Sequence, residues 1–144
     1  MVQVQFTECH FSKSFTTMAK YQKKKGTLGE QEVKKYITEK GYDVIAENYT
    51  VRGGEIDLIA AKGDELHFIE VKTRKRSDLH TGLESIDIRK QKRIAMAAVK
   101  FCTEHGFDLQ PCFDAAIVCM EDGIVLSIDY YENAFETTGF DLFI

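Results

Sequence analysis

Hydrophobic positions along this chain repeat first with a helical period, then with a period of two, and later with a helical period again. The first helical block begins after Thr27 and ends at Gly41, and its apolar positions are Leu28, Val33, Tyr36 and Ile37. Thr27 is a favourable N-cap residue and Glu30 stands three positions later, so the pattern predicts a helix that opens with a capping box. Residues 42–49 then predict a first strand, and residues 52–54 a turn.

The next stretch, residues 54–72, reads GEIDLIAAKGDELHFIEVK and places apolar segments on both sides of a glycine turn. A two-residue loop of Gly63 and Asp64 suits a type II′ hairpin turn, because glycine comes first. Lys62 and Glu65 then flank the turn as the first pair of residues. The stretch therefore predicts two antiparallel strands.

Residues 75–83 are polar and predict a loop, after which apolar side chains return at helical spacing in Ile86, Ile94, Ala97, Ala98 and Phe101. We expect a second helix there that ends near residues 105–106. Residues 113–120 predict a buried strand, residues 121–123 a turn and residues 124–131 a last strand. The resulting order, α-β-β-β-α-β-β, predicts an α/β domain with a mixed β-sheet flanked by helices.

The hairpin also predicts which side chains face one another, because paired residue numbers in an antiparallel ladder have a constant sum. Counted from the turn, Asp57 faces Glu70. By the same rule Glu55 faces Lys72. These four ionisable side chains would share one face of the hairpin, and the other face would carry Ile56, Leu58, Ile69 and Val71.

The opposed acids Asp57 and Glu70 are the first candidates for chemistry. Directly opposed residues have Cβ atoms about 4.5–5.5 Å apart, so two carboxylates there repel unless a positive charge lies between them. A divalent cation fits, since Mg²⁺ favours carboxylates together with water and phosphate oxygens. The charges are confined to one end of a face that is otherwise apolar, at Ile59, Ala61, Leu66 and Phe68. The pattern therefore predicts a metal site, and the alternatives are a solvated sheet edge or a carboxylate pair that shares a proton.

Lys72 lies two residues beyond Glu70, hence on the same face and about 6.5–7 Å further along the strand. An ammonium group there can orient a water molecule and stabilise charge that develops on a phosphate under attack. A metal held by carboxylates, with a lysine beside it, is an arrangement suited to phosphodiester hydrolysis.

Size and composition fit one ordinary globular domain of 144 residues, 44% hydrophobic and 29% charged. We expect residues 1–17 to be a loosely attached extension and residues 18–144 to form the domain, with its core at about 26–131. No apolar run approaches the roughly 18 residues of a membrane span. The first seventeen residues lack the pattern of a secretory signal, so we expect a cytoplasmic location and no membrane partner.

The four cysteines show no CxxC pair, and the four histidines match no zinc-ligand spacing. Three of the cysteines lie in apolar helix or strand patterns, where a free thiol behaves as a small hydrophobic group. The local spacing therefore predicts buried, reduced cysteines and no zinc site.

The net charge of −4 hides a strong asymmetry along the chain. All 19 lysines and arginines lie in residues 1–100, together with 14 of the 23 acidic residues, so residues 101–144 hold no lysine or arginine. Positive charge gathers at residues 20–25, 72–76 and 89–93. Such clusters are typical of a solvated face and also of a surface that binds a polyanion.

Two motifs carry a resemblance to known proteins. Gly54-Glu55-Ile56-Asp57 followed by Glu70-Val71-Lys72 resembles the PD-(D/E)-x-K nuclease superfamily. More closely, the chain resembles the YraN-like family of uncharacterised bacterial proteins, which have a restriction-endonuclease-like fold akin to that of Holliday-junction resolvases. The resemblance runs from about residue 26 to about residue 128 and includes Gly26, Gly29, Glu30, Asn48, Tyr49, Arg52, the stretch FIEVKTR, Gly82, Lys90, Arg93, Phe113 and Asp114.

The resemblance implies a metal-dependent endonuclease-like protein with Mg²⁺ (or Mn²⁺) as cofactor and nucleic acid, most of all DNA, as partner. Asp57 and Glu70 correspond to the metal ligands, with the backbone carbonyl of Val71 as a third. Lys72 corresponds to the catalytic lysine.

Two acidic residues have alternative roles at this point. Glu30 matches an acid that completes the site in resolvase-like members, or it closes the capping box with Thr27, and it cannot do both at once. Glu55 is either an outer partner of the metal site or the salt-bridge partner of Lys72. One departure from the family pattern is Cys112, which stands where family members tend to have arginine and so removes a cation near the expected edge of the site.

Candidate nucleic-acid contacts are the cations that leave the active strand and open the second helix: Arg74, Lys75, Arg76, Lys90 and Arg93. Such side chains contact backbone phosphates, which hold register without reading sequence. No element resembles a base-reading helix, which favours recognition of branched or damaged DNA over recognition of sequence. A resolvase makes two cuts and works as a dimer, so the resemblance also implies a homodimer as a possible assembly. The alternative function is a non-catalytic nucleic-acid- or partner-binding module that keeps the nuclease fold.

Overall fold

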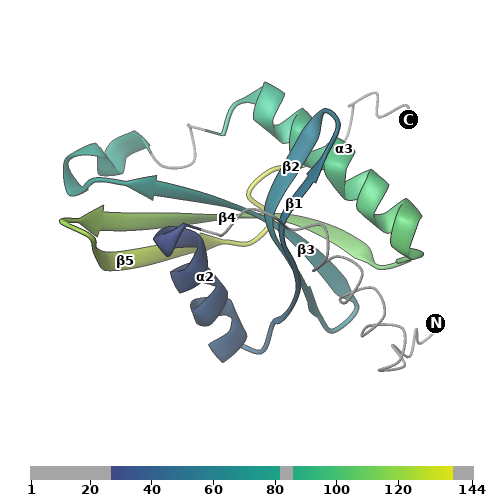
Figure 1. Cartoon of the computed structure of the whole chain (residues 1–144), viewed down its shortest axis with the longest axis horizontal. Coiled ribbons are helices and arrows are strands. Elements are labelled where there is room, and N and C mark those ends of the chain that lie inside the picture. Colours follow the sequence, from purple (N-terminus) through teal and green to yellow (C-terminus); the bar gives the residue numbers. More distant parts are fainter. Residues whose placement is uncertain (1–26, 82–85, 138–144) are drawn as a thin grey trace.

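The computed structural model describes residues 27–81 and 86–137, in which a five-stranded mixed sheet lies between two α-helices (Figure 1). The elements in chain order are α2 (Leu28–Glu39), β1 (Asp43–Val51), β2 (Gly54–Lys62), β3 (Glu65–Arg74), the short 3-10 helix η1 (Arg76–Thr81), α3 (Ile88–His105), β4 (Gln110–Glu121) and β5 (Ile124–Tyr131). The predicted α/β fold with its order α-β-β-β-α-β-β is confirmed. The expected extension at residues 1–17 lies outside the described residues.

The strands lie side by side in the order β1-β2-β3-β4-β5. All neighbours are antiparallel except β3 and β4, which run parallel. Parallel neighbours need a crossover connection, and α3 is the helix of this crossover. The parallel ladder pairs Glu65 with Gln110 at one end and Arg74 with Cys119 at the other. The start of β3 is therefore fixed beside the start of β4.

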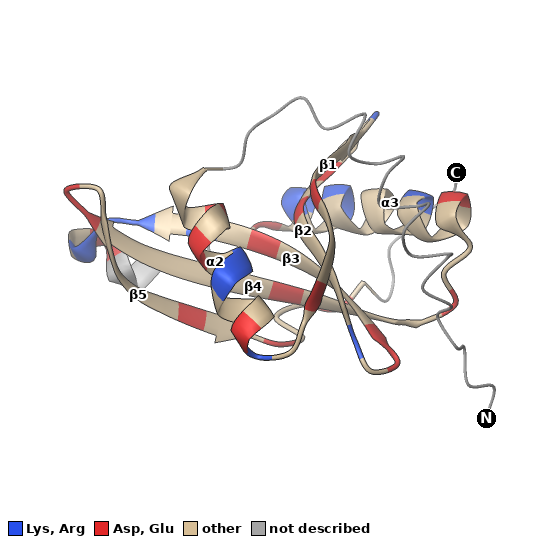
Figure 2. Ribbon diagram, turned by 60° about the horizontal axis from the view of Figure 1, so that its bottom comes forward, with Lys and Arg blue, Asp and Glu red and all other residues tan. Residues whose placement is uncertain are grey.

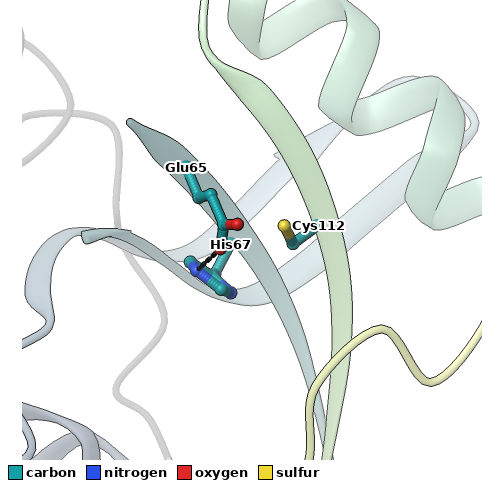
Figure 3. Close-up of side chains that lie close together, drawn as sticks. All are labelled: Glu65, His67 and Cys112. Carbon is teal, nitrogen blue, oxygen red and sulfur yellow. Dashed lines mark ion pairs between the residues drawn. The ribbon is translucent and has the colours of Figure 1, made fainter. Parts of the chain in front are cut away.

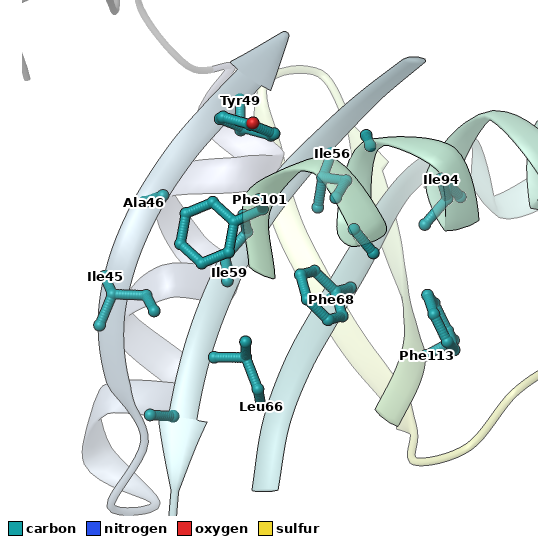
Figure 4. Close-up of a cluster of buried hydrophobic side chains, with 13 residues drawn as sticks. Ile45, Ala46, Tyr49, Ile56, Ile59, Leu66, Phe68, Ile94, Phe101 and Phe113 are labelled. Carbon is teal, nitrogen blue, oxygen red and sulfur yellow. The ribbon is translucent and has the colours of Figure 1, made fainter. Parts of the chain in front are cut away.

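Helix α3 covers one face of the sheet over a large apolar cluster (Figure 4). Its buried side chains meet those of the strands, chiefly Ile45, Ile56, Ile59, Leu66, Phe68 and Phe113. Phe101 packs edge-on against Tyr49 and Phe68, with ring centroids 5.2 and 6.2 Å away. Asp87 caps the start of the helix, and Gly106, with a φ of 67°, ends it in the left-handed conformation that glycine adopts without strain.

The first residue of β2, Gly54, lies close to α3. A Cβ atom added at Gly54 would collide with the backbone carbonyl of Arg93 and press on Ala97. Glycine at this position therefore lets the helix approach the strand, and it fixes how near the N-terminal half of α3 lies to the sheet.

Helix α2 covers the opposite face of the sheet, where Val33 and Ile37 are fully buried. The predicted capping box is present at its start. The sequence places Leu28 on the buried face as well, and this is wrong, since Leu28 is 45% exposed. Gly29 is buried instead, because the buried stripe runs through positions 29, 33 and 37 at intervals of four residues.

Two hairpin turns contain a glycine with a positive φ. In the β2–β3 hairpin Gly63 has a φ of +60° and Asp64 does not have a positive φ, as a type II′ turn requires. Asp122 and Gly123, between β4 and β5, both have a positive φ, as in a type I′ turn. The loop predicted at residues 75–83 is corrected in part, because Arg76–Thr81 forms η1. In the described ranges, none of the helices has the length and apolarity to cross a membrane.

Candidate metal centre

The candidate centre lies where β2 and β3 separate. Their ladder keeps the register predicted from the turn as far as Leu58 opposite Ile69. Asp57 and Glu70 follow directly beyond this last pair. Oδ2 of Asp57 accepts a hydrogen bond of 2.8 Å from the backbone N–H of Val71. A side-chain oxygen thus takes the place of a backbone carbonyl at the end of the ladder and satisfies a donor that needs a partner.

The facing of side chains at the start of β2 differs from the prediction. The ladder places Ile56 on the face of Leu58, and this is wrong, because Ile56 packs in the cluster under α3 together with Ile59. Strand alternation is therefore interrupted between Ile56 and Leu58. On the neighbouring strand, Asn48 has a left-handed backbone with a φ of 48°, which breaks the regular pleat at this level. Asp57 lies at this break, and its carboxylate reaches the edge of β3.

The two acids lie in a poorly solvated place. Glu70 is 3% exposed, and its Oε2 atom has no hydrogen-bond partner among the described residues. Burial, followed by the charge of Glu70, raises the pKa of Asp57 to about 7, although the N–H of Val71 acts in the opposite direction. Two carboxylates so placed do not both stay charged unless a cation lies with them, and otherwise they share a proton.

Two lysines bring positive charge to Glu70. Nζ of Lys72 lies 3.5 Å from Oε1 of Glu70. Nζ of Lys90 lies 3.4 Å from the same oxygen and 3.0 Å from Oε1 of Glu55. Burial lowers the pKa of Lys90, but the carboxylates of Glu70 and Glu55 outweigh burial and raise the pKa overall, so this ammonium stays charged.

The position of Lys90 differs from the role expected for it. The sequence suggests Lys90 as a phosphate contact, whereas the structure turns Lys90 inward, onto Glu55 and Glu70. Glu55, for which the sequence left open an outer role at the metal site or a salt bridge with Lys72, forms an ion pair with Lys90. A signal for this exists in the sequence, because Lys90 begins the helical stripe that continues through Ile94, Ala97 and Phe101. Asp87 fixes the start of that stripe, since its side chain accepts a hydrogen bond from the N–H of Lys90.

Glu30 serves the cap of α2. Its Oε2 accepts a hydrogen bond from the N–H of Thr27, and Oγ1 of Thr27 accepts one from the N–H of Glu30, both at 3.2 Å. The pKa of Glu30 is raised overall, by burial and by the nearby charge of Asp57, although hydrogen bonds with Thr27 and Asn48 act in the opposite direction. Of the two roles that the sequence leaves open, capping is thus present, at the edge of the acidic centre.

The other predicted phosphate contacts are Arg74, Lys75, Arg76 and Arg93. Lys75, Arg76 and Arg93 are exposed, and Arg74 is half-buried with Nη1 donating to the carbonyl of Thr73. Figure 2 shows lysine and arginine along α3 and beyond the end of β3. The cluster at residues 20–25 lies outside the described residues.

One groove borders the end of β3. Arg74 and Lys75 line it on one side, and Glu121 and Asp122 from the β4–β5 turn line the other. The acidic side lowers the positive potential of this groove, so an anion would meet mixed charge there. Arg93, on α3, does not line this groove.

The donor atoms of the centre suit a hard divalent cation. The carboxylates of Asp57 and Glu70 and the backbone carbonyl of Val71 are all oxygen donors, which Mg²⁺ and Mn²⁺ prefer. Oε2 of Glu70 is a buried acceptor without a partner in the described part of the chain, and such atoms are rare unless a ligand or water meets them. The residues present therefore fit the expected ion.

Fold and site together define a single-domain α/β protein that carries a buried and a half-buried acid, Glu70 and Asp57, with two lysines at the split of its β2–β3 hairpin. The chain belongs to the uncharacterised protein family UPF0102, whose profile matches residues 29–118. This is the YraN-like family that its motifs resemble. All residues of the candidate centre fall within the matched range.

Proteins of the same family from several bacteria are similar to this chain. A UPF0102 protein of Symbiobacterium thermophilum is 42% identical over 94 residues, which cover 65% of this chain and 80% of that protein. One from Dictyoglomus turgidum is 38% identical over 112 residues, covering 76% and 95%. One from a Synechococcus strain is 36% identical over 118 residues, covering 77% and 90%. The similarity thus extends over 80–95% of the length of these relatives.

Proposed function

We propose that this protein is a metal-dependent nuclease that hydrolyses phosphodiester bonds in DNA. Asp57 and Glu70, with the carbonyl of Val71, hold a Mg²⁺ or Mn²⁺ ion, and Lys72 assists the attack of water. The observation that carries the proposal is the buried Glu70 beside the half-buried Asp57, where Oε2 of Glu70 has no hydrogen-bond partner among the described residues.

Each side chain has a separate part in the proposed reaction. When bound, a divalent ion lowers the pKa of a water molecule and neutralises charge on the phosphate. Asp57 is already oriented by the N–H of Val71 before any ligand arrives, which lowers the entropy cost of assembling the site. The side chain of Lys72 is 26% exposed, so its ammonium can reach a phosphate and stabilise charge that develops during attack.

Lys90 has a supporting part. It stays paired with Glu55 and Glu70, and its positive charge acts against the upward shift of the Asp57 pKa. Lys90 is therefore a positioning residue in this proposal, and Lys72 is the catalytic lysine.

The proposed substrate class follows from the kind of contacts that the rim offers. Arg93 and the cations after β3 can hold backbone phosphates, and such contacts carry no information about base sequence. We infer recognition of backbone shape, with branched or damaged DNA as the first substrates to test.

The test uses the full chain with Mg²⁺, Mn²⁺ or EDTA on labelled single-stranded, duplex and four-way-junction DNA. Asp57→Asn and Glu70→Gln keep side-chain size and remove one charge each. Asp129→Asn, on the exposed strand β5, is a matched control for the first change. We expect metal-dependent cleavage by the wild type and by Asp129→Asn only. Cleavage that survives both changes in the acid pair would contradict the proposal.

A non-catalytic DNA-binding module is the second candidate, and one observation favours it. Lys72 and Lys90 both contact Oε1 of Glu70, so the acids are partly neutralised by the chain itself. Such a module binds junction DNA with an affinity that falls steeply as salt rises. Binding that is unchanged by Asp57→Asn, with every substrate left intact in Mg²⁺ and Mn²⁺, would favour the module.

A further inference from the structure

The opposite end of β3 carries a second group of side chains that can bind metal. Ligand atoms of Glu65, His67 and Cys112 lie within 4.8 Å of one another. Figure 3 shows these three side chains close together. Glu65 and His67 are two residues apart on one face of β3. Cys112 comes from β4 and stands opposite His67 in the parallel ladder. None of the three belongs to the acid pair described above.

His67 is held so that one ring nitrogen points into this group. The residue is 2% exposed, and its Nδ1 lies 2.5 Å from Oδ2 of the buried Asp114. Asp114 also accepts hydrogen bonds from the hydroxyl of Tyr130 and the N–H of Asn133, as an ionised carboxylate does. The ring proton is therefore assigned to Nδ1, which leaves a lone pair on Nε2. Metal-binding histidines are oriented by a carboxylate in the same way.

The lone pair of Nε2 faces a second acceptor. Nε2 of His67 lies 3.2 Å from Oε2 of Glu65, yet it makes no hydrogen bond within the described part of the chain. Two acceptors at this distance repel unless a cation lies between them. A second ring proton would also relieve the repulsion, because the two side chains would then form an ion pair, although without the geometry of a hydrogen bond. Two ligands bound to one tetrahedral zinc at about 2.0–2.1 Å stand about 3.3 Å apart, which matches the observed spacing.

We propose that Glu65, His67 and Cys112 form a site for a thiophilic divalent cation, Zn²⁺ in the first place, with water as the fourth ligand. Nitrogen and sulfur donors favour Zn²⁺ over Mg²⁺, so this site differs in chemistry from the acid pair. The side chain of Glu65 is 46% exposed and gives the ion a path from solvent. The ion would tie the start of β3 to the start of β4, two strands that the chain connects only through η1 and α3.

Local spacing could not reveal this site. The ligands at 65 and 67 are far in sequence from the ligand at 112, and they meet because α3 returns the chain parallel to β3. The proposal does not rest on nuclease activity, so either can fail alone.

A cobalt titration tests the site. The full chain, reduced and free of any affinity tag, is titrated with Co²⁺ in excess Mg²⁺, which occupies the oxygen-donor centre. A thiolate-to-cobalt charge-transfer band in the near ultraviolet reports a cysteine ligand. We expect this band to saturate at one equivalent of Co²⁺ and to disappear on addition of one equivalent of Zn²⁺. A wild-type protein without the band overturns the proposal.

Matched variants identify the ligands. Cys112→Ala and Cys119→Ala each remove a buried thiol from β4, so they lose comparable packing. We expect Cys112→Ala to lose the band and to bind Zn²⁺ at least about 100-fold more weakly, since loss of an outer partner alone costs about 10- to 100-fold. Cys119→Ala should keep both properties. A band that survives Cys112→Ala overturns the assignment.

Two further measurements test the site even if Cys112→Ala does not fold. His67→Asn keeps a donor toward Asp114 and removes Nε2, so it should lose the band while circular dichroism shows an intact fold. Zn²⁺ should also raise the unfolding temperature of the wild type by mass action. A wild-type unfolding temperature that does not change with Zn²⁺ contradicts the site whatever the variants do.

Discussion

The two ends of strand β3 hold buried ionisable groups in different surroundings. At the open end, where β2 has separated, Glu70 lies with Asp57, Lys72 and Lys90. At the closed end His67 lies among acids and a thiol. Each end contains a buried atom without a hydrogen-bond partner in the described ranges, Oε2 of Glu70 and Nε2 of His67. Because the donors around these atoms are oxygen in one case and nitrogen and sulfur in the other, we expect different cations at the two ends.

Strand pairing explains why the ends differ. Beyond Leu58 the β2–β3 ladder has ended, so the side chain of Asp57 can reach the N–H of Val71. His67, in contrast, is paired on both sides, with Ala60 of β2 and Cys112 of β4. Asp57 is therefore free of the β2–β3 ladder, while His67 is held by backbone pairing on both sides.

The largest expected effect separates the ends by their metals. In Asp57→Asn, cleavage of junction DNA should fall by at least about 1,000-fold, because loss of one transition-state donor alone costs about 100- to 1,000-fold. The cobalt–thiolate band of the same preparation should keep its intensity and its titration midpoint. Rates come from single-turnover cleavage in Mg²⁺, with Asp129→Asn as control. A weaker cobalt band in Asp57→Asn would mean that the ends are coupled, and the comparison would fail.

The next effect separates the two lysines of the open end. Lys72→Met should lower the cleavage rate by about 100- to 1,000-fold at saturating Mg²⁺ with little loss of stability, because the lysine acts on the reacting phosphate. Lys90→Met leaves Glu55 and Glu70 without their shared partner, which should lower the free energy of unfolding by about 1–3 kcal/mol. Urea denaturation and single-turnover cleavage measure the two quantities. If Lys72→Met and Lys90→Met lost similar stability and cleaved DNA at equal rates, Lys72 would have only a structural role.

The third prediction uses pH on the metal-free protein. The folded-state pKa of Asp57 is about 7, above the unfolded value of about 3.9. The folded state thus binds this proton more tightly, so the contribution to stability is complete at low pH and is lost as pH rises through about 7. In EDTA we expect the free energy of unfolding to fall by about 1–3 kcal/mol between about pH 5 and pH 8.

The closed end must be separated from this measurement. Burial lowers the pKa of His67, but the hydrogen bond with Asp114 and the charge of Asp114 raise it by more, so the net shift of this pKa is upward. A raised histidine pKa also costs stability as pH increases. The difference between the wild type and Asp57→Asn isolates the open end, because only the wild type carries the Asp57 proton. Equal pH slopes for the two proteins would show that the acids do not share a proton.

Local patterns were sufficient for most of the fold. The capping box of Thr27 and Glu30, the turn at Gly63 and the stop at Gly106 each depend on a few neighbouring residues, and all are present. The exposed Leu28 was not predicted, because the buried stripe of α2 is shifted by one residue. The 3-10 helix η1 was not predicted either, since so short a helix has no hydrophobic period to reveal it.

The candidate site was predictable where it depends on one hairpin. Register within a hairpin follows from its turn, and it places Asp57 and Glu70 directly beyond the last pair of the β2–β3 ladder, close enough for the charge of Glu70 to act on Asp57. The inward position of Lys90 depends on the packing of α3 against β2, which the hairpin does not contain. The meeting of His67 with Cys112 depends on the parallel register of β3 and β4, which no local spacing encodes. These two contacts cross from one supersecondary unit to another, whereas the facing of Ile56 was predicted wrongly within the hairpin itself, where the break in strand alternation has no signal in the turn.

The smallest expected effect tests whether DNA lies at the open end. Arg93→Ala removes an exposed cation from α3, and Lys62→Ala removes one beside Glu65 at the closed end, where its ammonium lies 4.6 Å from the centre of the Tyr42 ring. Arg93→Ala should weaken junction binding a few-fold for every sequence and lower the salt dependence by about one phosphate contact. Lys62→Ala should leave the salt dependence unchanged. Binding is measured in Ca²⁺ to prevent cleavage, and equal losses in the two variants would place DNA over both ends of β3.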